Sequence, residues 1–382
     1  MKAGSRIVPI LCAFFVMGFC DVVGIATSYA KVDFALSETV AGFIPSMVFI
    51  WFLALSVPSS MLMNRIGRKR TVQVSNAITF VAMLIPFVSY NFVTCMTAFV
   101  LLGIGNTILQ VSLNPLLASV VKGDSLASSL TAGQVVKALS SFCGPLIALF
   151  AASTLGDWRM LFPIYALITL IVWLWLALTR IREDEEQVRG TTVRQAFGLL
   201  SDRRILMLFL GIFAIVGIDV GTNTVSTKLM IERAGWAVEK AALAASVYFV
   251  CRTAGAFAGS ILLSRMDERK YFKINILLAV LSVAALFFTG NPKVVLVFVG
   301  LVGFFCSSIF SVLFSFALKA RPDKANEISG FMITGVCGGA VIPPLMGVAT
   351  DIVGSQNGSL AVIALCMLYL VFCAFHRQSA NP

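Results

Sequence analysis

The sequence predicts an all-α membrane protein with twelve transmembrane helices, arranged as two pseudo-symmetric six-helix bundles. The first observation is composition, because 59% of the 382 residues are hydrophobic and 12% are charged, which excludes a soluble globular protein. The second is that twelve apolar segments are each long enough to cross a hydrocarbon core of about 30 Å. The third is that the two halves repeat polar features at an offset of about 200 residues, as internally repeated transporters do.

Charged or turn-rich breaks separate the apolar segments. One long polar connection, residues 181–203, contains Glu183-Asp184-Glu185-Glu186 and divides the chain. We therefore predict an N-terminal bundle at 1–180, a cytoplasmic linker at 181–203 and a C-terminal bundle at 204–382. The predicted helices are 6–30, 38–63, 71–90, 93–121, 124–152, 158–180, 204–231, 237–264, 271–289, 292–319, 324–352 and 357–376.

Basic residues in the loops predict the orientation. Lysine and arginine are concentrated in the termini and in the loops on the same side, which the positive-inside rule assigns to the cytoplasm. The net charge of +11 is thereby explained without nucleic acid as a partner. We expect a multi-pass protein of the cell (inner) membrane, with a retained first helix and both termini cytoplasmic. The opposite side carries only Lys31, Arg159, Arg233, Lys240 and Lys293.

Enzyme motifs are not found in the sequence. The nine cysteines are scattered without a CxxC pair, and His376 is the only histidine, so we expect neither a metal site nor a cofactor. No nucleophile–base motif or phosphate-binding glycine loop occurs. The sequence therefore favours a transport or binding function over catalysis.

Two acids lie deep inside apolar segments. Asp21 and Asp219 each follow an arginine, Arg6 or Arg204, by 15 residues, which places them roughly 22 Å along a helix. An acid at that depth costs about 2.5–3.5 kcal/mol or more, so it needs a partner, a proton or water. We interpret the pair as lining a polar cavity; the alternative is a protonated aspartate that ties two helices together.

Polar side chains also form stripes at helical spacing. Amides in such stripes suit a hydroxyl-rich ligand, although Asn and Gln also hold membrane helices together. Lys137 and Arg252 lie too deep to reach water easily, so each needs an acid, carbonyl groups or an anionic ligand. Asp21 or a bound anion is the predicted partner of Lys137. The stripes are Asn106, Gln110 and Asn114; Gln134, Lys137 and Ser141; and Asp219, Thr222, Asn223 and Ser226.

The loop Arg65-Ile-Gly67-Arg68-Lys69 resembles the signature that the major facilitator superfamily carries between its second and third spans, with Asn64 where the family usually has Asp. The same offset repeats this region at Ser260–Arg269. The resemblance implies the twelve-helix fold of that superfamily and a gating role for Arg65, Gly67 and Arg68.

Further motifs resemble the fucose/galactose/glucose:proton symporter family. They are Gly103-Ile-Gly105 with Gln110 and Asn114-Pro115, Ala132-Gly-Gln134, Val216–Gly221, Ser308–Leu318 and Gly338–Pro343. The resemblance implies proton-driven uptake, with Asp21 as the acid that takes the proton. Gln110 matches members of the glucose/galactose type, whereas Lys137 and Arg252 replace uncharged residues.

We therefore hypothesise a monomeric secondary transporter that imports a monosaccharide, a hexose or deoxyhexose, by proton-coupled symport and alternating access. Its partners would be the sugar, protons and the lipid bilayer. The alternatives are an importer of an acidic or modified sugar, an exporter or antiporter, and a sensor that does not transport. Proton coupling is assigned to Asp21, Lys137 and Asp219, and substrate binding to Asn106, Gln110, Asn114, Gln134, Lys137, Asn223 and Arg252.

Overall fold

The structure is a computed structural model, and its chain forms two compact units. The part of the predicted linker at 182–197 lies outside the described residues. The described residues are 4–23, 26, 29–30, 33–35, 38–121, 125–181, 198–236, 241 and 243–376. Unit 1 comprises Met1–Lys122, Gly133–Phe197 and Asp323–Thr334; unit 2 comprises Gly123–Ala132, Gly198–Pro322 and Gly335–Pro382.

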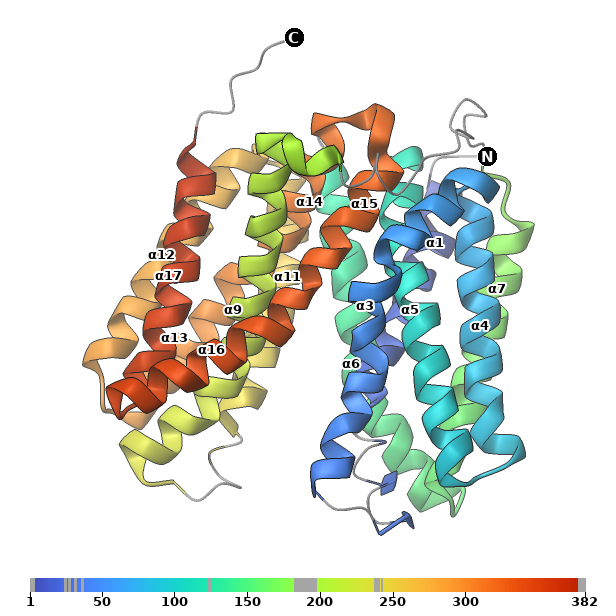
Figure 1. The fold of residues 1–382 in the computed structure, drawn as a ribbon, viewed down its shortest axis with the longest axis horizontal. Helices are drawn as coiled ribbons and strands as arrows, with labels where there is room; N and C mark the ends of the chain where they lie inside the picture. The colour runs from blue at the N-terminus through green and yellow to red at the C-terminus, as the bar shows by residue number, and fades with distance from the viewer. Residues whose placement is uncertain are drawn as a thin grey trace. The chain divides into compact units, whose positions relative to one another are not determined.

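Helices in the first half of the chain follow the predicted spans closely. Within unit 1, α4 packs against α5 and α7, and Figure 1 shows α4 and α5 side by side. Helix α6 begins in residues that belong to unit 2. The elements are α1 (Gly4–Met17), η1 (Gly18–Val22), α3 (Glu38–Ile66), α4 (Arg68–Val88), α5 (Phe92–Val120), α6 (Leu126–Thr154), η3 (Trp158–Met160) and α7 (Leu161–Leu178).

Helices in the second half also follow the predictions. Within unit 2, α12 and α17 run alongside each other (Figure 1), and α11 packs against α13. Helix α15 belongs to unit 1, where it packs on α3 and α5. The elements are η5 (Gly198–Ser201), α9 (Arg203–Ala234), α11 (Leu243–Leu263), α12 (Glu268–Phe288), α13 (Pro292–Cys306), α14 (Ile309–Ala320), η6 (Pro322–Lys324), α15 (Ala325–Thr334), η7 (Gly335–Cys337), α16 (Gly338–Val353) and α17 (Asn357–Phe375).

Ten helices in the described part of the chain are long and apolar enough to cross a membrane, and Ile7–Asp21 is a shorter apolar helix. Helix α3 adds 29 residues over the remaining predicted span. Large apolar side chains on these helices are exposed, including Leu178 at 84% and Phe288 at 91%, as contact with lipid tails allows. In the described part of the chain, each of the twelve predicted spans therefore corresponds to a helix or a pair of helices. Residues 24–25, 27–28, 124, 237–240 and 242 of these spans lie outside the described residues.

Three predicted spans change helix geometry or are interrupted well inside their length, in the described part of the chain. The first changes to a 3₁₀ turn at Gly18, and the tenth is interrupted at Ser307 and Ser308 between α13 and α14. The eleventh changes to a 3₁₀ turn, η7, between α15 and α16. In a membrane such breaks persist only where other groups in the protein satisfy the backbone. The break in the first span carries Asp21.

Candidate functional site

The break in the first span is held by a side chain from α5. The amide Nδ2 of Asn106 donates a hydrogen bond to the carbonyl of Met17 (2.7 Å), the last residue of α1 before the 3₁₀ turn η1. Asn106 is 1% exposed, so this bond is made away from solvent, where an unpaired carbonyl would be costly. Asn106 thus fixes the point at which the helix geometry changes.

Glycine at position 18 allows η1 to approach α6 closely. A Cβ atom there would lie 2.6 Å from Cβ of Ser140 and 2.7 Å from the carbonyl oxygen of Lys137. The second contact is with backbone, so it could not be relieved by a side-chain rotation. The absence of a side chain at Gly18 therefore lets Asp21, three residues later, reach α6.

Asp21 is exposed and hydrogen-bonds to two uncharged side chains. Ser141 Oγ on α6 donates to Oδ2 of Asp21 (2.5 Å), and Cys20 Sγ donates to Oδ1 (3.4 Å). Neutral partners stabilise a carboxylate far less than a cation does. Within the described residues, the carboxyl of Asp21 forms no ion pair.

Lys137 lies one turn before Ser141 on the same face of α6, half-buried like Gln134. No ion pair within 4.0 Å joins Lys137 to another described residue. Lys137 and Asp21 both act electrostatically on the Cys20 thiol, so the two charges share one neighbourhood. Their direct pairing remains a prediction.

The amide stripe on α5 is buried and hydrogen-bonded internally. Gln110 Nε2 donates to Oδ1 of Asn106 (2.8 Å), and Asn114 Nδ2 donates to the carbonyl of Gln110 (3.1 Å). Gln110 is 7% exposed and Asn114 is 2% exposed. Oδ1 of Asn114 is buried and has no hydrogen-bond partner in the described part of the chain. The stripe therefore combines helix packing with at least one unused acceptor.

In unit 2, Asp219 has a cationic partner. Arg252 on α11 forms an ion pair with it, with 2.8 Å between Nε and Oδ1, and Tyr248 donates its hydroxyl to the same oxygen (2.6 Å). Tyr248 precedes Arg252 by one helical turn, so both side chains face α9. Tyr248 was not among the site residues predicted from the sequence, although its spacing of one helical turn from Arg252 was the available signal.

Asn223 lies one turn beyond Asp219 on α9 and is half-buried. Its Oδ1 atom is buried and, among the described residues, makes no hydrogen bond. The hydroxyl of Thr222 is also buried and makes no hydrogen bond to a described residue. Because buried polar groups are normally paired, these two residues offer unused hydrogen-bonding capacity next to Asp219.

The turn between α3 and α4 contains the predicted gating residues. Gly67 adopts a φ of 89°, which lies in the region that favours glycine. Arg68 is 8% exposed, and its Nε donates to Oδ1 of Asn326 on α15 (2.7 Å). Arg65 is exposed. The turn is thus anchored through Arg68.

Asn64 joins the same network at the position where the resembled family usually has an acid. Its Nδ2 donates to Oε1 of Glu327 (2.8 Å), and its Oδ1 accepts from Nδ2 of Asn326 (2.6 Å). An asparagine can do both, because its amide group is donor and acceptor at once. All these residues belong to unit 1.

A third acid, Asp33, lies at the end of unit 1 where α4 turns into α5. Its Oδ2 accepts hydrogen bonds from Tyr90 Oη (2.7 Å) and Trp158 Nε1 (2.9 Å), and Arg159 lies over the Tyr90 ring. Burial and then the bond to Asp33 raise the pKa of Tyr90. This cluster ties together three connections and includes none of the predicted site residues.

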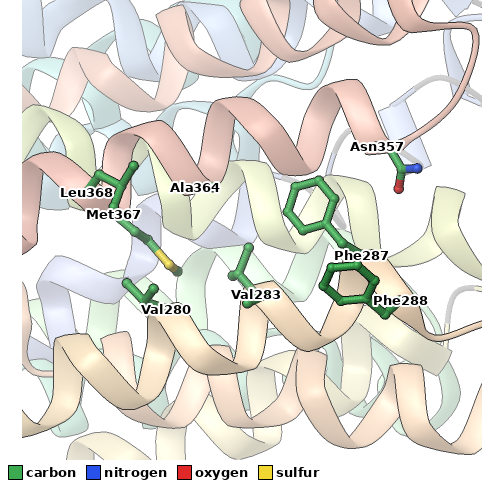
Figure 2. Close-up of a pocket in the computed structure, with 9 residues that line it drawn as sticks. Val280, Val283, Phe287, Phe288, Asn357, Ala364, Met367 and Leu368 are labelled. Atoms are coloured by element: carbon green, nitrogen blue, oxygen red, sulfur yellow. The ribbon is translucent and has the colours of Figure 1, made fainter.

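Figure 2 shows a pocket of about 390 Å³ between α12 and α17. Its lining is apolar apart from Asn357, with Phe287, Phe288 and Met367 among the side chains drawn. It contains none of the predicted site residues. An apolar groove between helices that expose Phe288 and Leu368 matches a lipid-facing surface better than a sugar site.

No group of three metal-binding side chains occurs among the described residues, and the nine cysteines are free thiols. Among the residues predicted to couple protons or bind substrate, the charged ones are Asp21 with Lys137 nearby in unit 1, and Asp219 bonded to Arg252 in unit 2.

Comparisons with known proteins decide the family. A sequence profile of the Major Facilitator Superfamily matches residues 10–344 and 225–382. The chain belongs to the Major Facilitator Superfamily. It is thus a multi-pass membrane protein of a transporter family, as the sequence predicted, and not an enzyme.

Relatives within this superfamily match almost the whole chain. A glucose/galactose transporter of Brucella abortus biovar 1 (strain 9-941) is 26% identical and covers 97% of this chain and 93% of its own. A putative glucose/galactose transporter of Helicobacter pylori (strain ATCC 700392 / 26695) is 26% identical, with 96% of each chain covered. The crystal structure of the transporter FucP in the outward conformation has a TM-score of 0.83 at 19% identity, with 97% of this chain and 98% of that chain covered, which supports the fold.

Proposed function

We propose that this transporter imports a neutral monosaccharide, a hexose or deoxyhexose, together with a proton, and that Asp21 carries the proton. The observation that carries the proposal is that Asp21 and Asp219 bond to different kinds of side chain. Asp21 is exposed and bonded to the uncharged Ser141, whereas Asp219 is bonded to Arg252. A carboxyl that must gain and lose a proton needs access and no permanent counter-ion.

The two sugar transporters that match nearly the full chain support a monosaccharide as substrate. The unused hydrogen-bonding atoms support the same class. Oδ1 of Asn114 is such an acceptor in unit 1; within unit 2, Oδ1 of Asn223 is another and Thr222 adds a hydroxyl. Each of these groups suits a sugar hydroxyl. Gln110 and Gln134 are the further amides proposed to contact the sugar; Asn106 contributes mainly by holding the break at Met17.

A neutral sugar is favoured over an acidic one because Arg252 already has an anion. Its Nε lies 2.8 Å from Asp219, so binding a carboxylate substrate there would require that bond to be replaced. Lys137 remains the cation available near Asp21, and it would keep Asp21 charged until substrate binding or rearrangement separates them. This is the coupling step of the proposal.

The remaining assignments follow the same proposal. Both termini are cytoplasmic in the inner membrane, and alternating access moves the sugar across it. The loop residues Arg65, Gly67 and Arg68 act in gating, supported by the bond between Arg68 and Asn326. That bond would have to break or form when access alternates.

The test is uptake into proteoliposomes with an imposed inward proton gradient, using neutral hexoses, deoxyhexoses and acidic sugars. The proposal predicts that a neutral sugar accumulates and that an ionophore collapses the accumulation. Accumulation of acidic sugars alone would assign Lys137 and Arg252 to the substrate instead. If no sugar accumulates, sugar import is wrong and an exporter becomes the next hypothesis to test.

A further inference from the structure

Ser141 is absent from the residues to which the sequence assigned a role, yet it makes the shortest contact to Asp21. Its Oγ lies 2.5 Å from Oδ2 of Asp21 and 3.1 Å from the carbonyl oxygen of Lys137, one turn earlier on α6. A serine hydroxyl carries one hydrogen and two acceptor lone pairs. It can therefore donate to only one of these two oxygens at a time.

This geometry suits both protonation states of the acid. When Asp21 is ionised, the hydroxyl of Ser141 donates to Oδ2. When Asp21 is protonated, the acid's own O–H donates to Oγ of Ser141, and the serine hydrogen turns to the carbonyl of Lys137. The proton added to Asp21 is the only one gained, and every polar hydrogen remains bonded in both states.

We propose that Ser141 is a positioning residue for proton coupling, whose hydroxyl reverses its donor direction when Asp21 gains or loses a proton. This inference rests on the proposed function of Asp21. It extends that function by naming the group that keeps the acid hydrogen-bonded in both states and that sets how tightly it holds its proton.

Other groups around Asp21 do not take this role. Cys20 reaches Oδ1 with a weak thiol donor at 3.4 Å, and α5 contributes the neutral amides of Asn106 and Gln110. Among the described residues, Cys20 on its own segment and Tyr165 on α7 interact electrostatically with Asp21; Lys137 acts on the same Cys20 thiol, and Cys143 on α6 acts on Tyr165. Among the hydrogen bonds of Asp21 to described residues, that of Ser141 is the one from a neighbouring helix.

The close approach of the two segments is built into the sequence. Gly18 lies against Ser140 and the Lys137 carbonyl, where a Cβ atom would be too close at 2.6 and 2.7 Å. Ser141 follows Ser140 directly, so the contact at Gly18 fixes its distance from Asp21. The geometry does not depend on a flexible long side chain.

The experiment is a pH titration by infrared difference spectroscopy of the purified full chain in lipid, without sugar. The band of the protonated Asp21 carboxyl is the one that disappears in Asp21→Asn. In Ser141→Ala the ionised acid loses a donor, so the titration midpoint should rise by about one pH unit. Ser141→Thr, which keeps the hydroxyl, should titrate within a few tenths of a unit of the unmodified protein.

Ser140→Ala is the matched control. Ser140 is the adjacent residue, 1% exposed, and its hydroxyl is buried with no partner in the described part of the chain; alanine keeps the Cβ that contacts Gly18. No shift is expected. An unchanged midpoint in Ser141→Ala, an equal shift in Ser140→Ala, or the lack of any titrating Asp21 band between about pH 4 and 10 would overturn the inference.

Different results would reject the proposed function of Asp21 and the proposed role of Ser141. If Asp21→Asn still accumulates sugar against its gradient, the proposed function of Asp21 is wrong whatever the spectra show. If Asp21→Asn abolishes accumulation while the Ser141→Ala midpoint stays in place, Asp21 carries the proton and only the role of Ser141 is rejected.

Discussion

Asp21 in unit 1 and Asp219 in unit 2 look equivalent in the sequence, since both lie 15 residues after an arginine inside an apolar span. In the structure they differ in backbone and in partners. Asp21 lies on a 3₁₀ turn and bonds to Ser141 and Cys20. Asp219 lies on the continuous helix α9 and bonds to Arg252 and Tyr248.

The difference teaches that depth in the membrane does not by itself make an acid a proton carrier. A cation at 2.8 Å stabilises the charged form of a carboxylate, and uncharged hydrogen-bond donors stabilise it far less. We therefore assign the two acids different roles. We propose that Asp21 takes the proton and that Asp219 neutralises and positions Arg252.

The largest expected effect comes from Asp21→Asn. This change removes the carboxyl proposed to take the proton, so uphill sugar accumulation driven by a proton gradient should fall to the equilibrium ratio of one. Exchange of labelled for unlabelled sugar, which needs no net proton movement, should persist. Accumulation and counterflow measured on the same proteoliposomes check both points, and accumulation left intact would abolish the distinction between the two acids.

Breaking the pair in unit 2 should affect stability more than coupling. Arg252→Ala leaves Asp219 without its cation and should lower the free energy of unfolding by about 1–3 kcal/mol, a value discounted because the Arg252 side chain is 37% exposed. Thermal unfolding in lipid measures it. The double variant Asp219→Asn/Arg252→Gln removes both charges and should be less destabilised than Arg252→Ala. The reverse order would contradict the view that each residue of the pair neutralises the charge of the other.

Replacing Asn106, the α5 residue that bonds to the Met17 carbonyl, should change the geometry around Asp21. Asn106→Leu leaves the carbonyl of Met17 with the weak thiol of Cys20 (3.4 Å) as its remaining side-chain donor among the described residues, which should cost about 1–3 kcal/mol of stability and weaken coupling as well. Ser112→Ala is a matched control on the same helix, because Ser112 is fully buried and its hydroxyl bonds, among the described residues, to the carbonyls of Ile108 and Leu109 on its own helix. Equal effects on coupling would contradict a specific role for Asn106.

The smallest effect on stability is expected at the surface ion pair of Asp157 and Arg159. This pair serves as a reference for what an ion pair contributes when it is exposed to water. Asp157→Asn should change stability by less than about 0.5 kcal/mol. The bond from Arg159 lowers the pKa of Asp157 below its ordinary 3.8, so any stabilisation is present at neutral pH and is lost as pH falls below about 4. Melting curves of the unmodified protein and of Asp157→Asn at pH 7 and pH 3 check this. A difference in melting temperature between them that is larger at pH 3 than at pH 7 would contradict the predicted direction.

Much of the fold was predictable because hydrophobic length sets membrane spans. The span predicted at 357–376 is α17 (Asn357–Phe375), and that predicted at 71–90 is α4 (Arg68–Val88). The break at Gly18 was not predictable. The stretch Gly18-Phe19-Cys20 contains no proline, and the groups that hold the break, Asn106 and the backbone of α6, come from distant helices.

Most charged residues of the site were predictable from the sequence, but which residues bond to each other was not. Sequence spacing identified Asp21, Asp219 and Arg252 as charges deep in membrane spans that need partners. It could not pair Arg252 with Asp219, because the partner of a buried charge depends on which helix faces which. Tyr248 and Ser141 escaped assignment for the same reason, since a lone hydroxyl becomes informative only when an acceptor lies within reach.

Proton movement coupled to sugar transport tests the central claim most directly. Purified protein in weakly buffered proteoliposomes is given the transported sugar, and the pH of the medium is recorded for the unmodified protein, Asp21→Asn and Asp219→Asn/Arg252→Gln. We expect sugar-induced alkalinisation in the unmodified protein and in the double variant, and none in Asp21→Asn. Alkalinisation that survives in Asp21→Asn, or that is lost in a folded double variant still able to exchange sugar, would contradict the assignment of the proton to Asp21.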